Sequence, residues 1–169
     1  MAQTAMKTEP QGGADAVAYL SGYMEHLALI ERLHRLLLDV VKDEFERLGI
    51  IDINSVQALL LFNIGENEVT AGELKSRGYY QGSNVSYNLK KLVQAGYMHH
   101  QKCAVDRRAV RVKLTEKGRD VRMTVAQLFA RHASVLQKKD ILDGEDLGDM
   151  NGAMKRMERF WTDQIRFIY

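Results

Sequence analysis

This chain of 169 residues has only one proline and one cysteine, and no apolar run long enough to span a membrane. Proline breaks the interior of a helix, so its scarcity permits long uninterrupted helices. With Cys103 as the only cysteine, a disulfide within the chain is excluded, which fits a reducing compartment. Since neither a membrane span nor a secretory signal is present, we expect a cytoplasmic protein without a membrane partner.

The chain also has little net charge, and its basic residues are concentrated in one block. The formal charge is +2, with 46% hydrophobic and 27% charged residues, which is typical of a globular protein. The segment between Leu74 and Lys113 contains nine lysines and arginines and a single acid, Asp106. Its formal charge is therefore +8, which leaves −6 for the remainder of the chain. Such a block favours a nucleic-acid partner, although a solvated charged face is the alternative for any basic run.

The basic block contains a predicted β-hairpin with a charged tip. Its second strand alternates apolar and polar residues from Val110 to Leu114, and its first runs from Tyr97 to Cys103. The tip carries Asp106, Arg107 and Arg108. Thr115 is a predicted N-cap of the helix that follows.

Two short helices are predicted before this hairpin. Thr70 and Glu73 have the spacing of a capping box, so the first helix should run from about Ala71 to Gly78. Ser83 should cap the second, which Gly96 should end. On this second helix the residues with core spacing are Val85, Leu89, Leu92 and Val93, and the polar residues around the other face are Ser83, Asn84, Ser86, Tyr87, Lys90 and Lys91.

Helix, turn, helix and an arginine-tipped hairpin together predict a DNA-binding surface. Small hydroxyl and amide groups near a helix N-terminus suit base edges, and lysines one turn later suit phosphates. The predicted DNA contacts are Lys75, Arg77, Ser83, Asn84, Ser86, Tyr87, Lys90, Lys91, Asp106, Arg107, Arg108 and Arg111.

Residues 55 to 118 resemble the winged helix-turn-helix of the multiple-antibiotic-resistance regulator (MarR) family. The likeness rests on Ala71-x-x-Leu74, on Val85-Ser86-x-x-Leu89-x-x-Leu92 before Gly96-Tyr97, and on the wing motif Asp106-x-Arg108 with Leu114-Thr115-x-x-Gly118. It implies a sequence-specific transcriptional regulator that binds a pseudo-palindromic operator on double-stranded DNA. It further implies that Arg108 enters the minor groove and that Asp106 orients it.

Two features bear on which member of the family the chain resembles. Tyr87 is a departure, since many relatives have arginine there and tyrosine cannot make the bidentate guanine contact. The stretch Tyr79 to Leu92 is similar to an alphaproteobacterial subgroup linked to control of cell-wall transpeptidase genes.

Repression is the default expectation for the direction of regulation, because a dimer that covers a promoter blocks polymerase without any further protein.

Long helices are predicted on both sides of this region, giving a mainly α fold with a small β-hairpin wing. We expect a mobile tail over 1–13, an N-terminal dimerisation helix within 14–53, the winged helix-turn-helix over 54–118 and C-terminal dimerisation helices over 119–169, as one MarR-like chain. The last helix has an apolar stripe at spacings of three and four: Met150, Met154, Met157, Trp161, Ile165 and Ile168. The stripe predicts a homodimer interface, with packing inside one chain as the alternative.

The family resemblance also implies a small-molecule effector bound between the DNA-binding lobe and the dimer helices. Candidate contacts are Tyr19, Tyr23, Met24, His26, Tyr79 and Tyr80, which are equally interpretable as ordinary core or surface residues. Some relatives sense oxidants through a cysteine on the N-terminal helix. Cys103 is instead at a strand end beside Lys102, so a passive thiol is the preferred interpretation over a redox sensor.

Catalytic and metal-binding patterns are not found in the sequence. His99 and His100 are adjacent on a strand and point to opposite faces, while His26 and His34 are eight apart on one helix. We expect no cofactor, no metal and no enzymatic activity. The remaining alternative is a winged-helix adaptor or antirepressor that acts through protein partners, for which a +8 block has no evident purpose.

Overall fold

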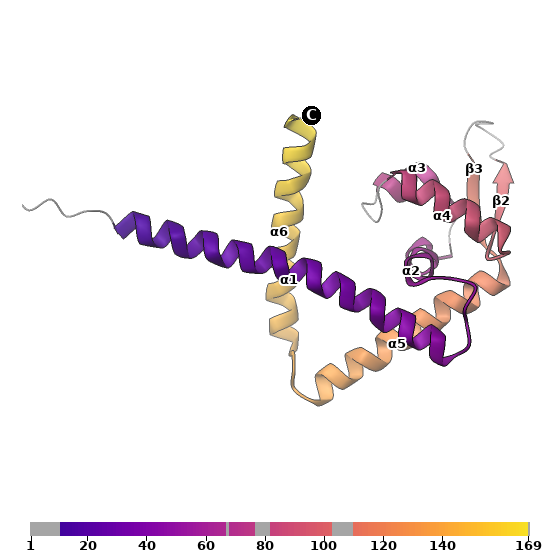
Figure 1. The fold of residues 1–169 in the computed structure, drawn as a ribbon, viewed down its shortest axis with the longest axis horizontal. Coiled ribbons are helices and arrows are strands. Elements are labelled where there is room, and N and C mark those ends of the chain that lie inside the picture. The colour runs from indigo at the N-terminus through magenta and orange to yellow at the C-terminus, as the bar shows by residue number, and fades with distance from the viewer. Residues whose placement is uncertain (1–10, 67, 77–81, 103–109, 169) are drawn as a thin grey trace, which may run out of the picture. The chain divides into compact units, whose positions relative to one another are not determined.

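A computed structural model describes residues 11–66, 68–76, 82–102 and 110–168. The fold is mainly helical with one small antiparallel sheet, which confirms the predicted fold class (Figure 1). The chain forms two compact units, one up to Leu60 and one from Leu61 onward. Within the described ranges no helix is both long and apolar enough to cross a membrane.

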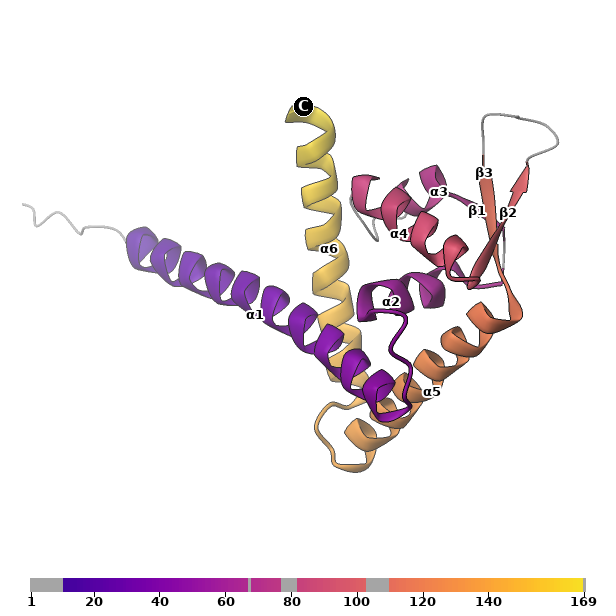
Figure 2. The ribbon, with the colours of Figure 1, turned by 45° about the vertical axis from the view of Figure 1, so that its right-hand side comes forward.

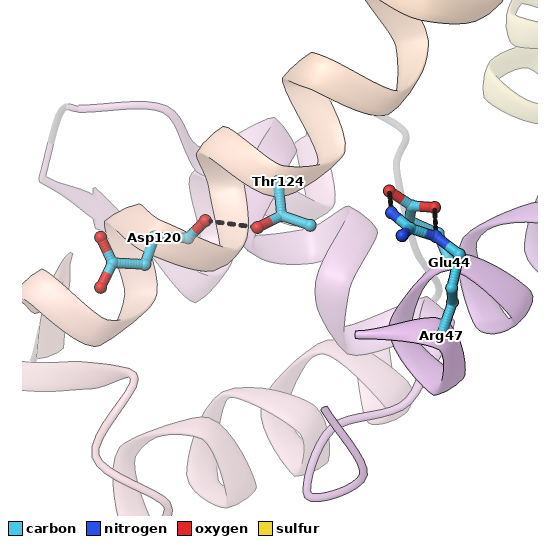
Figure 3. Close-up of polar contacts among 4 residues, drawn as sticks. All are labelled: Glu44, Arg47, Asp120 and Thr124. Atoms are coloured by element: carbon cyan, nitrogen blue, oxygen red, sulfur yellow. Dashed lines mark hydrogen bonds and ion pairs between the residues drawn. The ribbon is translucent and has the colours of Figure 1, made fainter. Parts of the chain in front are cut away.

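The first unit contains the helix α1 (Gln11–Arg47) and most of α2 (Ser55–Ile64). α1 begins three residues before the expected Ala14, because two glycines that disfavour helix by roughly 1 kcal/mol each do not stop a helix already nucleated. Near its end Arg47 donates from Nε and Nη2 to the two carboxylate oxygens of Glu44, both at 2.9 Å (Figure 3). These bonds raise the pKa of Arg47.

A capping box starts α2. Asn54 Oδ1 accepts from Gln57 N at 2.9 Å, and Gln57 Oε1 accepts from Asn54 N at 3.2 Å. Leu59, Leu60 and Ile64 of this helix are buried.

The second unit holds two short helices, α3 (Ala71–Ser76) and α4 (Gly82–Gln94). The predicted capping box of α3 is present: Thr70 Oγ1 accepts from Glu73 N at 3.1 Å and Glu73 Oε2 accepts from Thr70 N at 2.6 Å. Ser83 is not the N-cap, because α4 begins at Gly82, two residues earlier than a cap at Ser83 predicts, and includes Ser83 in its first turn.

Three strands form the sheet in the order β1-β3-β2: β1 (Val69–Thr70), β2 (Met98–Lys102) and β3 (Val110–Leu114) (Figure 2). β2 and β3 are the predicted hairpin, with Met98 opposite Leu114 and Lys102 opposite Val110. Sequence analysis did not predict β1. Its two residues pair antiparallel with β3, which therefore becomes the central strand.

Two long helices follow the sheet, α5 (Glu116–Lys138) and α6 (Gly144–Ile168). Thr115 caps α5 as predicted, with its side chain accepting from Gly118 N at 3.2 Å. Asp143 and Asp146 form a reciprocal cap at the start of α6, where Asp143 Oδ1 accepts from Asp146 N at 2.7 Å.

Side chains of α5 bind it to the start of the second unit. Arg122 Nη1 donates to Glu66 at 2.7 Å, and the rings of Phe62 and Phe129 meet edge to face with centroids 5.3 Å apart. Thr124 lies one turn after Asp120 and donates its hydroxyl to the Asp120 carbonyl at 2.9 Å within the helix (Figure 3). Contacts to residues distant in sequence therefore fix the first half of α5.

Candidate nucleic-acid interface

The helix α4 separates its apolar and polar residues between two faces. Val85, Leu89 and Leu92 are buried, as their helical spacing predicts, while Val93 is half-buried. On the other side Ser86, Tyr87, Lys90 and Lys91 are exposed, and Tyr87 is exposed over 61% of its surface. An exposed helix face with hydroxyl, phenol and ammonium groups can donate to base edges and to phosphate oxygens.

Two of these exposed side chains interact with each other. The ammonium of Lys91 lies 5.7 Å from the ring centroid of Tyr87, one helical turn away. A cation over an aromatic face at this distance contributes about 0.5–1 kcal/mol at an exposed site. The pair restricts the rotamers of both side chains before any ligand is present.

The lobe behind α4 is a packed core. Leu74 on α3 and Val69 on β1 are completely buried, and Val112 on β3 is nearly so. The alternation on β3 thus has its predicted meaning, because Val112 and Leu114 face the core while Arg111 and Lys113 are half-buried. A rigid base of this kind fixes the direction in which the α4 side chains project.

The structure adds a partner that sequence analysis missed. Lys113 Nζ lies 3.8 Å from a carboxylate oxygen of Glu68, the residue before β1. Because β1 pairs with β3, an acid that lies outside the basic block in the sequence is brought next to Lys113. The charge of Lys113, a member of the predicted basic block, is therefore partly neutralised. Arg111 on the same strand is paired with Thr70 of β1 on one side and with Gln101 of β2 on the other.

Several predicted contacts lie where side chains or backbone are not described. The backbones of Lys75, Ser83 and Asn84 lie in α3 and α4, but their side chains are outside the described residues. The predicted contacts wholly outside the described ranges are Arg77 and the hairpin tip with Asp106, Arg107 and Arg108, and Cys103 lies there too.

The candidate effector residues on α1 lie on successive turns of one helix. Tyr19 is 81% exposed, and Tyr23 and His26 are half-buried. The Nε2 atom of His26 is buried and has no hydrogen-bond partner among the described residues. Tyr79 and Tyr80 lie outside the described ranges.

Within residues 11–66, 68–76, 82–102 and 110–168, no group of three or more histidine, cysteine, aspartate or glutamate side chains is arranged to hold a metal ion.

A capped helix pair, an exposed second helix and a three-stranded sheet with a hairpin define the class of winged-helix DNA-binding proteins. Residues 53–118 match the family model described as "Winged helix DNA-binding domain". The match covers the part of the chain from the α2 capping box to the first turn of α5.

Comparison over the full length gives the family. The chain is 33% identical over 158 residues to the exopolysaccharide II synthesis transcriptional activator ExpG of Rhizobium meliloti (strain 1021), covering 94% of this chain and 81% of that protein. Among solved structures, the transcriptional regulator SlyA superposes with a TM-score of 0.71 at 20% identity, over 85% of this chain and 98% of that chain. The chain belongs to the MarR family of winged-helix transcriptional regulators.

A second solved structure shares the fold and contains DNA. It is a mutant of MarR from E. coli complexed with operator DNA, with a TM-score of 0.62 at 20% identity, covering 77% of this chain and 91% of that chain. The family model and the relative at 33% identity make the protein a winged-helix transcription regulator.

Proposed function

We propose that the protein binds a pseudo-palindromic operator as a homodimer and regulates transcription from it. The observation that carries this proposal is the exposed face of α4, where Ser86, Tyr87, Lys90 and Lys91 stand on a fully packed lobe. Ser86 and Tyr87 contact base edges, and the two lysines contact phosphates. Lys75, Arg77, Ser83, Asn84 and Arg111 complete the major-groove surface.

In this proposal the wing supplies the minor-groove contacts. Arg108 enters the groove beside the recognition site, Asp106 orients it and Arg107 contacts the backbone. Narrow A·T-rich tracts attract arginine, so the sequences flanking each half-site should be rich in A·T pairs. Two α4 helices related by a two-fold axis require half-sites about 34–36 Å apart, one helical turn of DNA.

The dimer is supported by apolar residues that a single chain leaves exposed. On α6 three residues of the stripe are exposed, Met150, Met154 and Ile165, with Ile165 exposed over 66% of its surface. Met157 and Trp161 of the same stripe are half-buried. Exposed leucines also occur along α1. Isolated apolar residues on a surface are ordinary, but a row at helical spacing over a whole helix favours a protein partner. A second copy of the chain provides it in a closed two-fold interface.

A small-molecule effector is the proposed regulator of DNA binding. Support comes from His26, whose buried Nε2 has no hydrogen-bond partner among the described residues. Such a group has an unmet preference for a donor or an acceptor. Tyr19, Tyr23, Tyr79 and Tyr80 are the other proposed contacts. An effector must bind more tightly to one spacing of the two lobes than to the other.

The direction of regulation has two candidates. Repression follows from geometry, because a dimer on a promoter excludes polymerase. Activation is favoured by the relative at 33% identity, which is a transcriptional activator. The position of the operator separates the two, since a repressor site overlaps the promoter and an activator site lies upstream of it.

The alternative molecular role is an adaptor or antirepressor with the same fold and no operator. Binding to fluorescent DNA from the protein's own upstream region, with salt titrated and random DNA as competitor, decides between the two roles. The proposal predicts nanomolar binding that resists the competitor and weakens by about 10³–10⁵ between 50 and 200 mM salt. Equal and weak affinity for both DNAs would instead support the adaptor.

A further inference from the structure

The carboxyl end of α4 is held by the residues that begin α5. Thr115 Oγ1 donates to Gly96 O at 2.7 Å, and Lys117 Nζ donates to Ala95 O at 3.3 Å. The last carbonyls of a helix have no partner inside it, so these two bonds satisfy groups that would otherwise need water. We refer to residues 95–97 and 115–118 together as the α4–α5 joint.

Thr115 has two roles in the α4–α5 joint. Its hydroxyl donates to the Gly96 carbonyl at the end of α4 and accepts from Gly118 N at 3.2 Å at the start of α5. Its own backbone N–H donates to Tyr97 O at 3.0 Å. One residue therefore caps one helix and closes the other, so a movement of α5 at this point is transmitted to α4.

Lys117 adds a second connection through an aromatic ring. Its ammonium lies 4.0 Å from the ring centroid of Tyr97, a residue that is only 1% exposed. The same ammonium donates to the Ala95 carbonyl, at the negative end of the α4 dipole. The positive charge of Lys117 therefore interacts with the backbone at the end of α4 and with the buried Tyr97 ring that follows this helix.

Gly118 allows the two segments to approach this closely. A Cβ atom built at position 118 would overlap the carbonyl oxygen of Tyr97, which is a backbone atom and cannot rotate away. Any side chain here must push the first turn of α5 away from Tyr97. Glycine is therefore required by the packing of the joint and not by its own backbone conformation.

We propose that Thr115, Lys117 and Gly118 are positioning residues for DNA recognition: they fix the direction of α4 without contacting DNA. This inference rests on the proposed function, in which α4 contacts the base edges. Base contacts need their donors and acceptors in place to within about half an ångström, whereas phosphate contacts tolerate more movement. A looser α4–α5 joint should therefore reduce specific binding more than binding to random DNA.

The competing explanation is that Lys117, an exposed cation, contacts a phosphate directly. A phosphate contact contributes equally on all sequences and to the salt dependence. A positioning residue changes the preference for the operator and leaves the salt slope as it is. It also changes α4 in the protein without DNA, which a phosphate contact does not.

The test combines two measurements on the full-length protein and four variants. The first is amide hydrogen exchange of free protein at the carboxyl end of α4, where Ala95 N, Gly96 N and Tyr97 N are bonded inside the turn. The second is the ratio of affinities for a site selected from a random DNA library and for random DNA. Lys117→Met removes the charge, Lys117→Arg keeps it, and Gly118→Ala forces the segments apart. Lys138→Met is the control at the far end of the same helix.

Lys117→Met should accelerate exchange at these amides about threefold or more and lower the affinity ratio by a similar factor, with an unchanged salt slope. Lys117→Arg should keep the exchange rates and the affinity ratio close to those of the wild type, and Lys138→Met should change neither quantity. Gly118→Ala should lower the ratio about tenfold or more. If the Gly118→Ala variant does not fold, the comparison of Lys117→Met with Lys117→Arg tests the proposal by itself.

The proposal is overturned if the wild type discriminates between the two DNAs while Lys117→Met leaves exchange and affinity ratio unchanged. It is also overturned if Lys117→Met weakens both DNAs equally with a shallower salt slope, which would identify a phosphate contact. A wild type that does not discriminate would refute the proposed function itself, and that result is distinct from both.

Discussion

The two amphipathic helices α4 and α6 differ in what their apolar faces contact. On α4 the apolar residues are buried in the same chain, with Val85 and Leu92 both 1% exposed. On α6 the stripe has the same helical spacing, yet Met150, Met154 and Ile165 remain exposed. The helical pattern alone predicts an apolar face in both cases. Only the fold reveals which face is already covered.

The difference assigns separate tasks to the two regions. A helix that buries its apolar face in its own lobe can present its polar face to a ligand at a fixed angle. A helix with an uncovered apolar stripe gains most of its stabilisation from a partner. We therefore expect changes on α6 to act through assembly and changes on α4 to act through recognition.

The largest effect is expected for Ile165→Lys on α6. A lysine in the stripe puts two charges into a two-fold interface, so the dimer dissociation constant should rise by about 100-fold or more, with a similar loss of operator affinity. Sedimentation at several concentrations measures the first quantity and fluorescence anisotropy the second. Asp163→Lys places a lysine on the opposite face of the same helix and should leave the dimer intact. An Ile165→Lys dimer of wild-type stability would contradict the interface.

A smaller loss is expected when the wing arginine is removed. Arg108→Ala should weaken binding to most sequences about tenfold and make the salt dependence shallower, because a cation in the minor groove is lost from each subunit. Titrations at four salt concentrations measure both. Lys155→Ala, outside the predicted surface, is the control. Unchanged affinity and slope for Arg108→Ala would remove the wing from the account.

Tyr87→Ala should change which base is preferred more than it changes affinity. A lost contact to one base edge amounts to about 1–3 kcal/mol of discrimination at that position. Selection from a random library with each variant displays the change as one altered position in each half-site. Lys90→Ala is the matched variant and should weaken all sequences alike. An identical preferred sequence for Tyr87→Ala and wild type would show that α4 does not read bases through this residue.

The smallest effect is on the stability of the DNA-binding lobe. Thr70→Ala removes the hydroxyl that accepts from Glu73 N, and loss of such a cap costs about 1 kcal/mol. Thr124→Ala removes a hydroxyl that donates to the Asp120 carbonyl of its own helix (Figure 3) and should change stability by less than about 0.5 kcal/mol. Urea unfolding measures both. Equal losses would mean that the capping box contributes nothing particular to α3.

Features set by neighbouring residues were predictable from the sequence. The caps at Thr70 and Thr115 depend on groups three residues away, and the structure has both of them. The hairpin of β2 and β3 also follows from local alternation. The start of α4 was predicted two residues too late, because several small polar residues near Gly82 are equally able to begin a helix.

Features that depend on the fold were not predictable. β1 is two residues long and exists because β3 pairs with it. The pair of Arg122 and Glu66 joins residues 56 positions apart, and the α4–α5 joint brings Lys117 onto Tyr97 across the whole hairpin. Periodicity and spacing contain no information about such contacts. For the candidate site, the helix face was predictable, while the residues that hold it in place were not.

The most direct test of the central claim is to change the spacing of the half-sites. DNA selected by the protein is compared with the same DNA carrying about five extra base pairs between the half-sites, which is half a helical turn. If two α4 helices of one dimer bind successive major grooves, affinity should fall by about 100-fold or more, to that of a single half-site. Equal affinity for both DNAs would contradict the dimeric readout on which the account depends.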